Sequence, residues 1–110
     1  MVVDQTDVDL LFRALADATR RDIVRRTLDE HCSISSLARG YPMSFAAVQK
    51  HVAVLERAGL VTKQRSGREH LVAGNPAALR IAHDALDRLE LIWRERVRRM
   101  DNLLATDPDL

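Results

Sequence analysis

Apolar residues recur every three or four positions along most of this chain, which is the spacing of helices that bury one face. Val48, Val52 and Leu55 form one such stripe, and Ser44 just before it is a residue type that begins helices. The same periodicity predicts five helices, at about residues 7–16, 18–29, 33–39, 44–58 and 75–104.

One segment departs from the helical pattern and predicts a β-hairpin. Gly59 lies where a left-handed residue commonly ends a helix. Beyond it, residues 60–65 and 68–73 predict two short strands joined by a turn at Ser66 and Gly67. The predicted fold is therefore mainly α with a small β-hairpin: four helices, the hairpin, then a fifth helix. This order is typical of a winged helix-turn-helix, in which the hairpin is the wing.

The chain length fits one domain of residues 1–110. Within it we expect a helix-turn-helix core and wing at 7–74, a helix for dimerisation at 75–104, and a disordered tail at 105–110.

The fifth predicted helix carries more apolar surface than so small a domain can cover. Its length is roughly 43 Å at 1.5 Å per residue. We expect its apolar seam to pack against the first helix and against a second copy of the chain. The alternative is a long helix within a single chain, with a frayed end. The residues expected between two copies are Val8, Leu11, Phe12, Leu15, Leu86, Leu89, Trp93, Val97 and Met100.

The composition of the chain indicates its cellular compartment, and it argues against a membrane protein and against an enzyme. No apolar run approaches the roughly 20 residues of a membrane span, so no membrane partner is expected. The amino-terminal stretch is acidic, unlike a secretory signal, which predicts a cytoplasmic protein. Cys32 is the only cysteine, so an intrachain disulfide is impossible. There is no Gly-rich phosphate loop or catalytic constellation, and we expect neither an enzyme nor a cofactor.

The distribution of charge suggests double-stranded DNA as the partner, although the net charge is only +1. Residues 46–75 contain five basic and two acidic side chains, while residues 1–17 are acidic. A helix with a small polar outer face fits the major groove, and a basic hairpin beside it fits the backbone or minor groove. The candidate DNA-binding residues are Ser44, Phe45, Ala46, Gln49, Lys50, His51, Arg57, Lys63, Arg65, Arg68 and Arg20.

These candidates have different expected roles. Gln49 is the first choice for reading a base, because its amide can pair bidentately with adenine. The lysines and arginines are phosphate candidates. Phe45 either contacts thymine methyl groups or packs as core in the turn before the helix, and the sequence leaves both open. A solvated charged face without DNA is the alternative for the whole surface.

The segments FRALADATRRDIV (12–24) and MSFAAVQKHVAVLERAGLV (43–61) resemble the ArsR-type family of bacterial winged-helix repressors. The resemblance covers roughly residues 11–104. It implies a homodimer joined through the first and fifth helices, and a repressor that binds a palindromic operator. It leaves the inducer unknown.

The metal site that many members of this family carry is not expected here. Serines replace the paired cysteines at the third helix, and soft metals need converging thiolates. His83, Asp87 and Glu90 share a face of the fifth helix and leave a metal-responsive alternative open, and Cys32 leaves a redox-responsive one. A module that binds only proteins is a further alternative.

Overall fold

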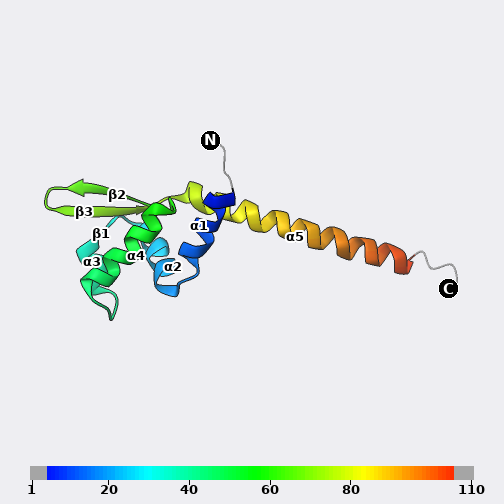
Figure 1. Ribbon diagram of the computed structural model, residues 1–110, viewed down its shortest axis with the longest axis horizontal. Coiled ribbons are helices and arrows are strands. Elements are labelled where there is room, and N and C mark those ends of the chain that lie inside the picture. Colours follow the sequence, from blue (N-terminus) through cyan, green and yellow to red (C-terminus); the bar gives the residue numbers. More distant parts are fainter. Residues whose placement is uncertain (1–4, 106–110) are drawn as a thin grey trace.

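The computed structural model describes residues 5–105, and it confirms the predicted order of helices and wing (Figure 1). One short strand, β1, had not been predicted. The elements are α1 (Gln5–Leu15), α2 (Ala18–Asp29), β1 (Cys32–Ser33), α3 (Ile34–Arg39), α4 (Phe45–Arg57), β2 (Val61–Ser66), β3 (Glu69–Gly74) and α5 (Pro76–Ala105).

Local sequence fixes where these helices begin. Asp17 caps α2 through a bond from the Arg20 backbone N–H, with 3.0 Å between N and Oδ1. Ser33 and Ser44 cap α3 and α4 in the same way. The Asn75 side chain accepts a hydrogen bond from the Ala77 N–H at the start of α5. Each cap satisfies a backbone donor that the helix itself leaves unpaired.

The wing belongs to a three-stranded antiparallel sheet in the order β1-β3-β2. Cys32 pairs with Val72, so the segment before α3, for which no strand was predicted, is a strand. The hairpin turn is Gly67 and Arg68, one residue later than predicted, because Ser66 pairs with Glu69. Gly67 has φ +63° and is the first of the two central residues, as in a type II′ turn.

The core lies where α2, α3 and α4 meet the base of the sheet. Leu37, Val52 and Val72 are fully buried there, one each from α3, α4 and β3. Leu11 of α1 is 2% exposed and also belongs to this core. It therefore offers almost no surface to a second copy, which revises the interface role expected for it.

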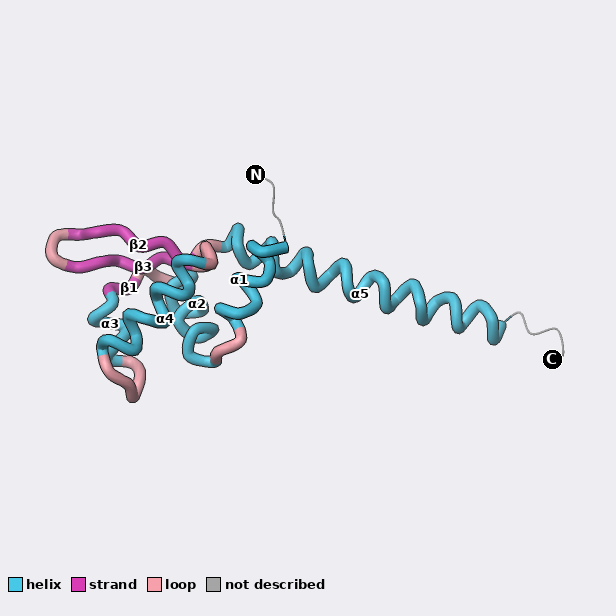
Figure 2. The backbone as a smooth tube through the Cα atoms, in the orientation of Figure 1, coloured by secondary structure: helices cyan, strands magenta, loops and turns pink. Residues whose placement is uncertain are grey.

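Helix α5 leaves the rest of the fold after its first turns (Figure 2). Ala78 and Ala82 are its buried residues, and α1 is the helix that packs on this part. The radius of gyration is 19.9 Å, against about 13 Å for a compact chain of this length. Ala105 ends α5, so it is helical rather than part of a tail, and the predicted tail 106–110 lies outside the described residues. No helix among residues 5–105 is long and apolar enough to cross a membrane.

Candidate nucleic-acid interface

Helix α4 presents a polar, solvent-facing side that is opposite its buried stripe. Val48, Val52 and Leu55 are buried as predicted. The spacing of a helix then turns Ala46, Gln49, Lys50 and Arg57 away from the core, and all four are exposed. This side combines one amide and two cationic side chains with small residues, which let another molecule approach the helix closely. It has the chemistry that reads and holds a DNA groove.

At the start of α4, Ser44 caps the helix and Phe45 is exposed. The Ser44 hydroxyl accepts from the Ala47 N–H at 3.1 Å, so this side chain caps the helix. Phe45 is 47% exposed. That exposure argues against the core alternative, because a core residue in the turn would be covered; the contact with thymine methyl groups stays a prediction. An exposed aromatic ring at this end of the helix is available to an apolar group outside the chain.

His51 faces α2 rather than the open side of α4. Its Nδ1 lies 3.3 Å from a terminal nitrogen of Arg20. A guanidinium only donates, so Nδ1 accepts. Arg20 also donates to the carbonyl oxygens of Ala14 at 2.7 Å and Arg13 at 3.0 Å. This half-buried arginine thus joins the end of α1 to α4, and the phosphate contact expected of it stays a prediction.

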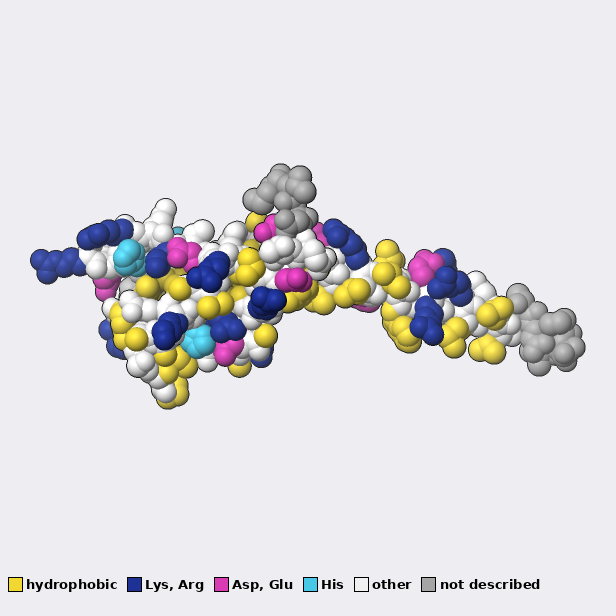
Figure 3. Space-filling model, in the orientation of Figure 1, with side chains coloured by type: hydrophobic (Ala, Val, Ile, Leu, Met, Phe, Trp, Pro, Cys, Tyr) yellow, Lys and Arg dark blue, Asp and Glu magenta, His cyan; other side chains and the backbone are white. Residues whose placement is uncertain are grey.

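One face of the wing continues from the core toward α4. Side chains alternate along a strand, so Lys63 and Arg65 share the face of buried Val61. Their cross-strand partners are Val72 and His70. The inner face of the sheet is therefore apolar at its base and basic toward its tip. Figure 3 shows the blue side chains that result on the projecting hairpin.

Two of the wing cations have partners within the chain. Lys63 Nζ lies 3.7 Å from Glu56 Oε1 at the end of α4, and Arg65 Nε donates to the Gly67 carbonyl at 3.2 Å. Arg68 occupies the turn itself and is exposed. Arg68 therefore lies at the tip of the wing, one position into the turn rather than at the start of the second strand.

A cleft of about 200 Å³ separates the start of α4 from the wing. Phe45 and Gln49 line it from α4, and Arg68 and His70 line it from the wing. Sequence reasoning missed His70. Strand alternation could have found it, because the predicted turn already places His70 on the face of Lys63 and Arg65, as the observed register opposite Arg65 does.

The apolar seam predicted on α5 is present and uncovered in the single chain. Leu86, Leu89, Trp93 and Met100 are 55–64% exposed. Val97, on the same side, is half-buried, as are Val8, Phe12 and Leu15 of α1. In Figure 3 yellow side chains follow one side of the distal helix.

The sequence left open a redox-responsive role for Cys32 and a metal-responsive role for His83, Asp87 and Glu90, and the structure shows the surroundings of these side chains. Cys32 is 7% exposed, and burial raises the pKa of its thiol. His83 lies beside Asp84, and Glu90 pairs with Arg94. Within residues 5–105 no three His, Cys, Asp or Glu side chains come together as a metal-binding group.

Comparison with known proteins agrees with this geometry. Residues 15–64 match the family model described as a helix-turn-helix domain. The chain is 33% identical over 101 residues to the HTH-type transcriptional regulator Rv2034 of Mycobacterium tuberculosis, covering 92% of each protein. The ArsR-like transcriptional regulator from Rhodococcus sp. RHA1 is 31% identical, with a TM-score of 0.78 over 89% of this chain and 92% of that one. A crystal structure of another ArsR family transcriptional regulator has the same TM-score at 26% identity, over 86% and 97% of the two chains.

The fold and the α4 and wing surface define a winged helix-turn-helix transcriptional regulator that binds DNA. Within that class, the chain belongs to the ArsR family.

Proposed function

We propose that this protein is a dimeric repressor that binds a palindromic operator. Helix α4 of each copy enters a major groove, and the wing contacts the backbone or the adjacent minor groove. Two such helices reach successive major grooves on one face of DNA, roughly 34 Å apart. Beyond the class of DNA-binding regulator, the proposal specifies a two-fold symmetric dimer, a palindromic operator and repression.

The observation that carries the DNA geometry is the pairing of two exposed surfaces. The outer side of α4 holds Gln49 and Lys50, and the wing tip holds Arg68, with a cleft between them. Gln49 supplies bidentate base contact, and the cations supply phosphate contact. Phe45 lines the same cleft and offers an apolar contact to a thymine methyl group.

The symmetry is supported by the uncovered seam of α5. Trp93, Leu89 and Met100 leave more than half of their surfaces in water in one chain. Contiguous apolar surface of this kind marks an interaction site. The same stripe on a second copy of the chain can cover this seam. The resulting dimer places two recognition helices on one duplex.

The test is fluorescence anisotropy with DNA from the promoter that precedes the protein's own coding sequence, against a scrambled duplex, at several salt concentrations. We expect selective, salt-sensitive binding that saturates at two chains per site. A reporter gene behind the same promoter should be less active when the protein is present. Equal binding to both duplexes, or activation of the reporter, contradicts the proposal.

Three variants make this test residue-specific. Gln49→Ala should relax base preference, with a loss of about 1–3 kcal/mol at one position. Arg68→Ala should weaken all sequences alike and lower the salt slope by about one. Arg98→Ala, which removes an exposed arginine paired with Glu95 on distal α5, is the matched control and should change neither.

Charge reversal separates the proposal from a module that binds only proteins. Arg65→Glu with Arg68→Glu should abolish operator binding, because two phosphate contacts become repulsive. Unchanged reporter activity with this double variant would favour the protein-binding alternative.

A further inference from the structure

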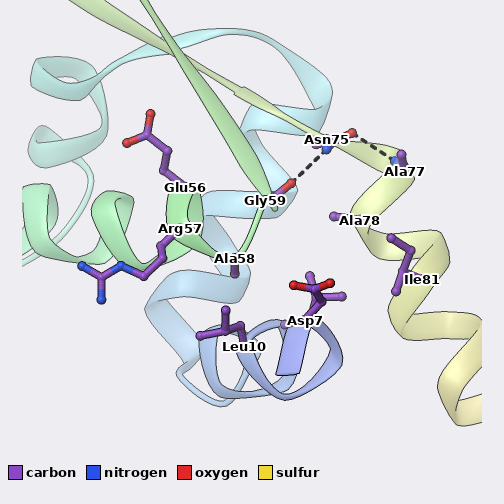
Figure 4. Close-up of a pocket in the computed structure, with 11 residues that line it drawn as sticks. Asp7, Leu10, Glu56, Arg57, Ala58, Gly59, Asn75, Ala77, Ala78 and Ile81 are labelled. Atoms are coloured by element: carbon purple, nitrogen blue, oxygen red, sulfur yellow. Dashed lines mark hydrogen bonds between the residues drawn. The ribbon is translucent and has the colours of Figure 1, made fainter. Parts of the chain in front are cut away.

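A half-open pocket lies where α1, the end of α4 and the start of α5 meet (Figure 4). Its volume is about 300 Å³, the lower limit for small-molecule sites. Leu10 and Leu11 line it from α1, and Ala78 and Ile81 line it from α5. The pocket is therefore mainly apolar and large enough for a molecule with one or two aromatic rings.

The charged groups around this pocket are not equivalent. In Figure 4 the Asp7 side chain extends from α1 into the space that Ala78 and Ile81 face. Glu56 and Arg57 also line the pocket, but their charged ends extend away from it in the same view. Lys63 lies 3.7 Å from Glu56, outside the pocket. Of these three charged side chains, the Asp7 carboxylate is the one that extends into the pocket.

The backbone adds to this negative potential. The last turn of α4 reaches the pocket at Ala58 and Gly59. The carboxyl end of a helix carries partial negative charge and favours cations within about one turn. A carboxylate has four lone-pair sites, so Asp7 can accept from a ligand as well as from other donors.

We propose that this pocket binds small hydrophobic molecules that carry one positive charge, such as arylalkyl ammonium ions. The rings occupy the apolar space between α1 and α5, and the ammonium group faces the Asp7 carboxylate. A neutral analogue retains the apolar contacts alone, and an anionic analogue meets repulsion from Asp7.

The position of the pocket gives such a ligand a means to regulate, a role that rests on the proposed function. Asn75 ties α5 to the end of α4: its Nδ2 donates to the Gly59 carbonyl at 2.9 Å, and its backbone N–H donates to the Leu60 carbonyl at 2.9 Å. A molecule in the pocket touches α1 and α5, which are expected to join two copies, and the end of α4. It therefore acts on the angle between the recognition helix and the dimer.

The test uses 1-naphthylmethylammonium, 1-naphthylmethanol and 1-naphthylacetate with the full chain labelled with ¹⁵N. With about 12 non-hydrogen atoms, the cation should bind with a dissociation constant on the order of 1 mM. Saturable shifts should concentrate at the amides of Asp7, Ala58, Gly59 and Ile81. The alcohol should bind about two- to five-fold more weakly, the gain expected of one exposed ion pair, and the acetate more weakly still.

Two variants at exposed positions locate the site without disturbing the core. Asp7→Asn should remove the preference for the cation over the alcohol, and Ala77→Phe should block all three probes by filling the pocket mouth. The matched controls are Asp9→Asn, also on α1, and Ala105→Phe, at the far end of α5. Both controls should bind the cation as the unaltered chain does.

Three outcomes overturn the proposal: no saturable shifts up to 10 mM (about ten times the expected dissociation constant), shifts centred elsewhere, or equal binding of cation and anion. Operator affinity is measured separately in the presence of the cation. If the cation binds here but the protein binds no operator, the pocket stands and the repressor proposal fails. If operator binding is intact and the cation does not bind, the pocket proposal fails alone.

Discussion

Arg20 and His51 join the second helix to the recognition helix, with 3.3 Å between the guanidinium nitrogen and the imidazole Nδ1. The same guanidinium holds the last carbonyls of α1. One side chain thus fixes the position of α4 relative to the helix that precedes the whole helix-turn-helix. These bonds give Arg20 a supporting role in the fold, while its contact with DNA stays a prediction.

Arg20→Ala should lower the free energy of unfolding by about 1–3 kcal/mol, because it removes three hydrogen bonds of about 0.5–1.5 kcal/mol each, partly replaced by water. Urea unfolding followed by circular dichroism measures this. Arg21→Ala is the control, since the Arg21 side chain is exposed and donates to the Leu15 carbonyl at 2.7 Å. An unchanged stability together with a salt slope lowered by about one would support the phosphate contact predicted from sequence.

The hydrogen bond between Tyr41 and Asp22 should make the free energy of unfolding depend on pH in the acid range. The Tyr41 hydroxyl donates to Asp22 Oδ2 at 2.7 Å, and this bond, followed by that from Arg25, lowers the pKa of Asp22. A carboxyl group with a lowered pKa in the folded state stabilises the fold above its unfolded pKa, and this stability is lost as pH falls through the folded pKa.

Tyr41→Phe should therefore reduce stability at pH 7 and bring the Asp22 pKa back toward about 3.9. Carbon NMR of the Asp22 carboxyl and urea unfolding from pH 7 to pH 2 measure the two effects. The difference between the proteins should shrink below pH 4, where Asp22 becomes protonated in both. A constant difference across that range would mean that Tyr41 acts through packing alone.

Leu89 and Leu91 provide matched positions on α5 for testing the dimer. Both are exposed, at 64% and 56%, but a helix turns them to nearly opposite sides. Leu89→Glu places a charge in the proposed seam and should raise the dimer dissociation constant at least about 100-fold. Leu91→Glu should leave it unchanged. Analytical ultracentrifugation across protein concentrations gives both constants, and equal effects would place the interface elsewhere.

Cys32 should react slowly in the native protein. Its burial, its raised thiol pKa and its bond to the Glu30 carbonyl all disfavour an accessible thiolate. Modification by a disulfide reagent should be at least about 100-fold slower than in urea, because it requires local opening. Rapid reaction in native buffer would revive the redox-responsive alternative.

Local signals in the sequence predicted most of the fold. Ser44 begins a helix as predicted, and the helices predicted from about residues 18 and 75 begin at the caps Asp17 and Asn75. A cap involves residues only two or three positions apart, so it is a local signal. The buried stripe of α4 was equally readable, since burial there follows the helical period.

Features that depend on residues far apart in the sequence were harder to predict from the sequence. Strand β1 is two residues long and exists through its pairing with Val72. Leu11 was indistinguishable from an interface residue, because an apolar side chain suits a core and an interface equally. The partner of Arg20 lies 31 residues away. The turn was misplaced by one residue because its position depends on which residues of the two strands pair, with Ser66 opposite Glu69.

If two copies join through α5 as proposed, the helicity of its distal half should change with assembly. An isolated helix of this length is marginal in water, since packing supplies most helical stability. Its ion pairs, Glu90 with Arg94 and Glu95 with Arg98, add only a few tenths of a kcal/mol each. We therefore expect the last turns to unwind readily in a lone chain, and to be stabilised by the apolar stripe of the second copy in the proposed dimer. Dilution should thus appear as lost ellipticity at 222 nm before the globular part begins to melt.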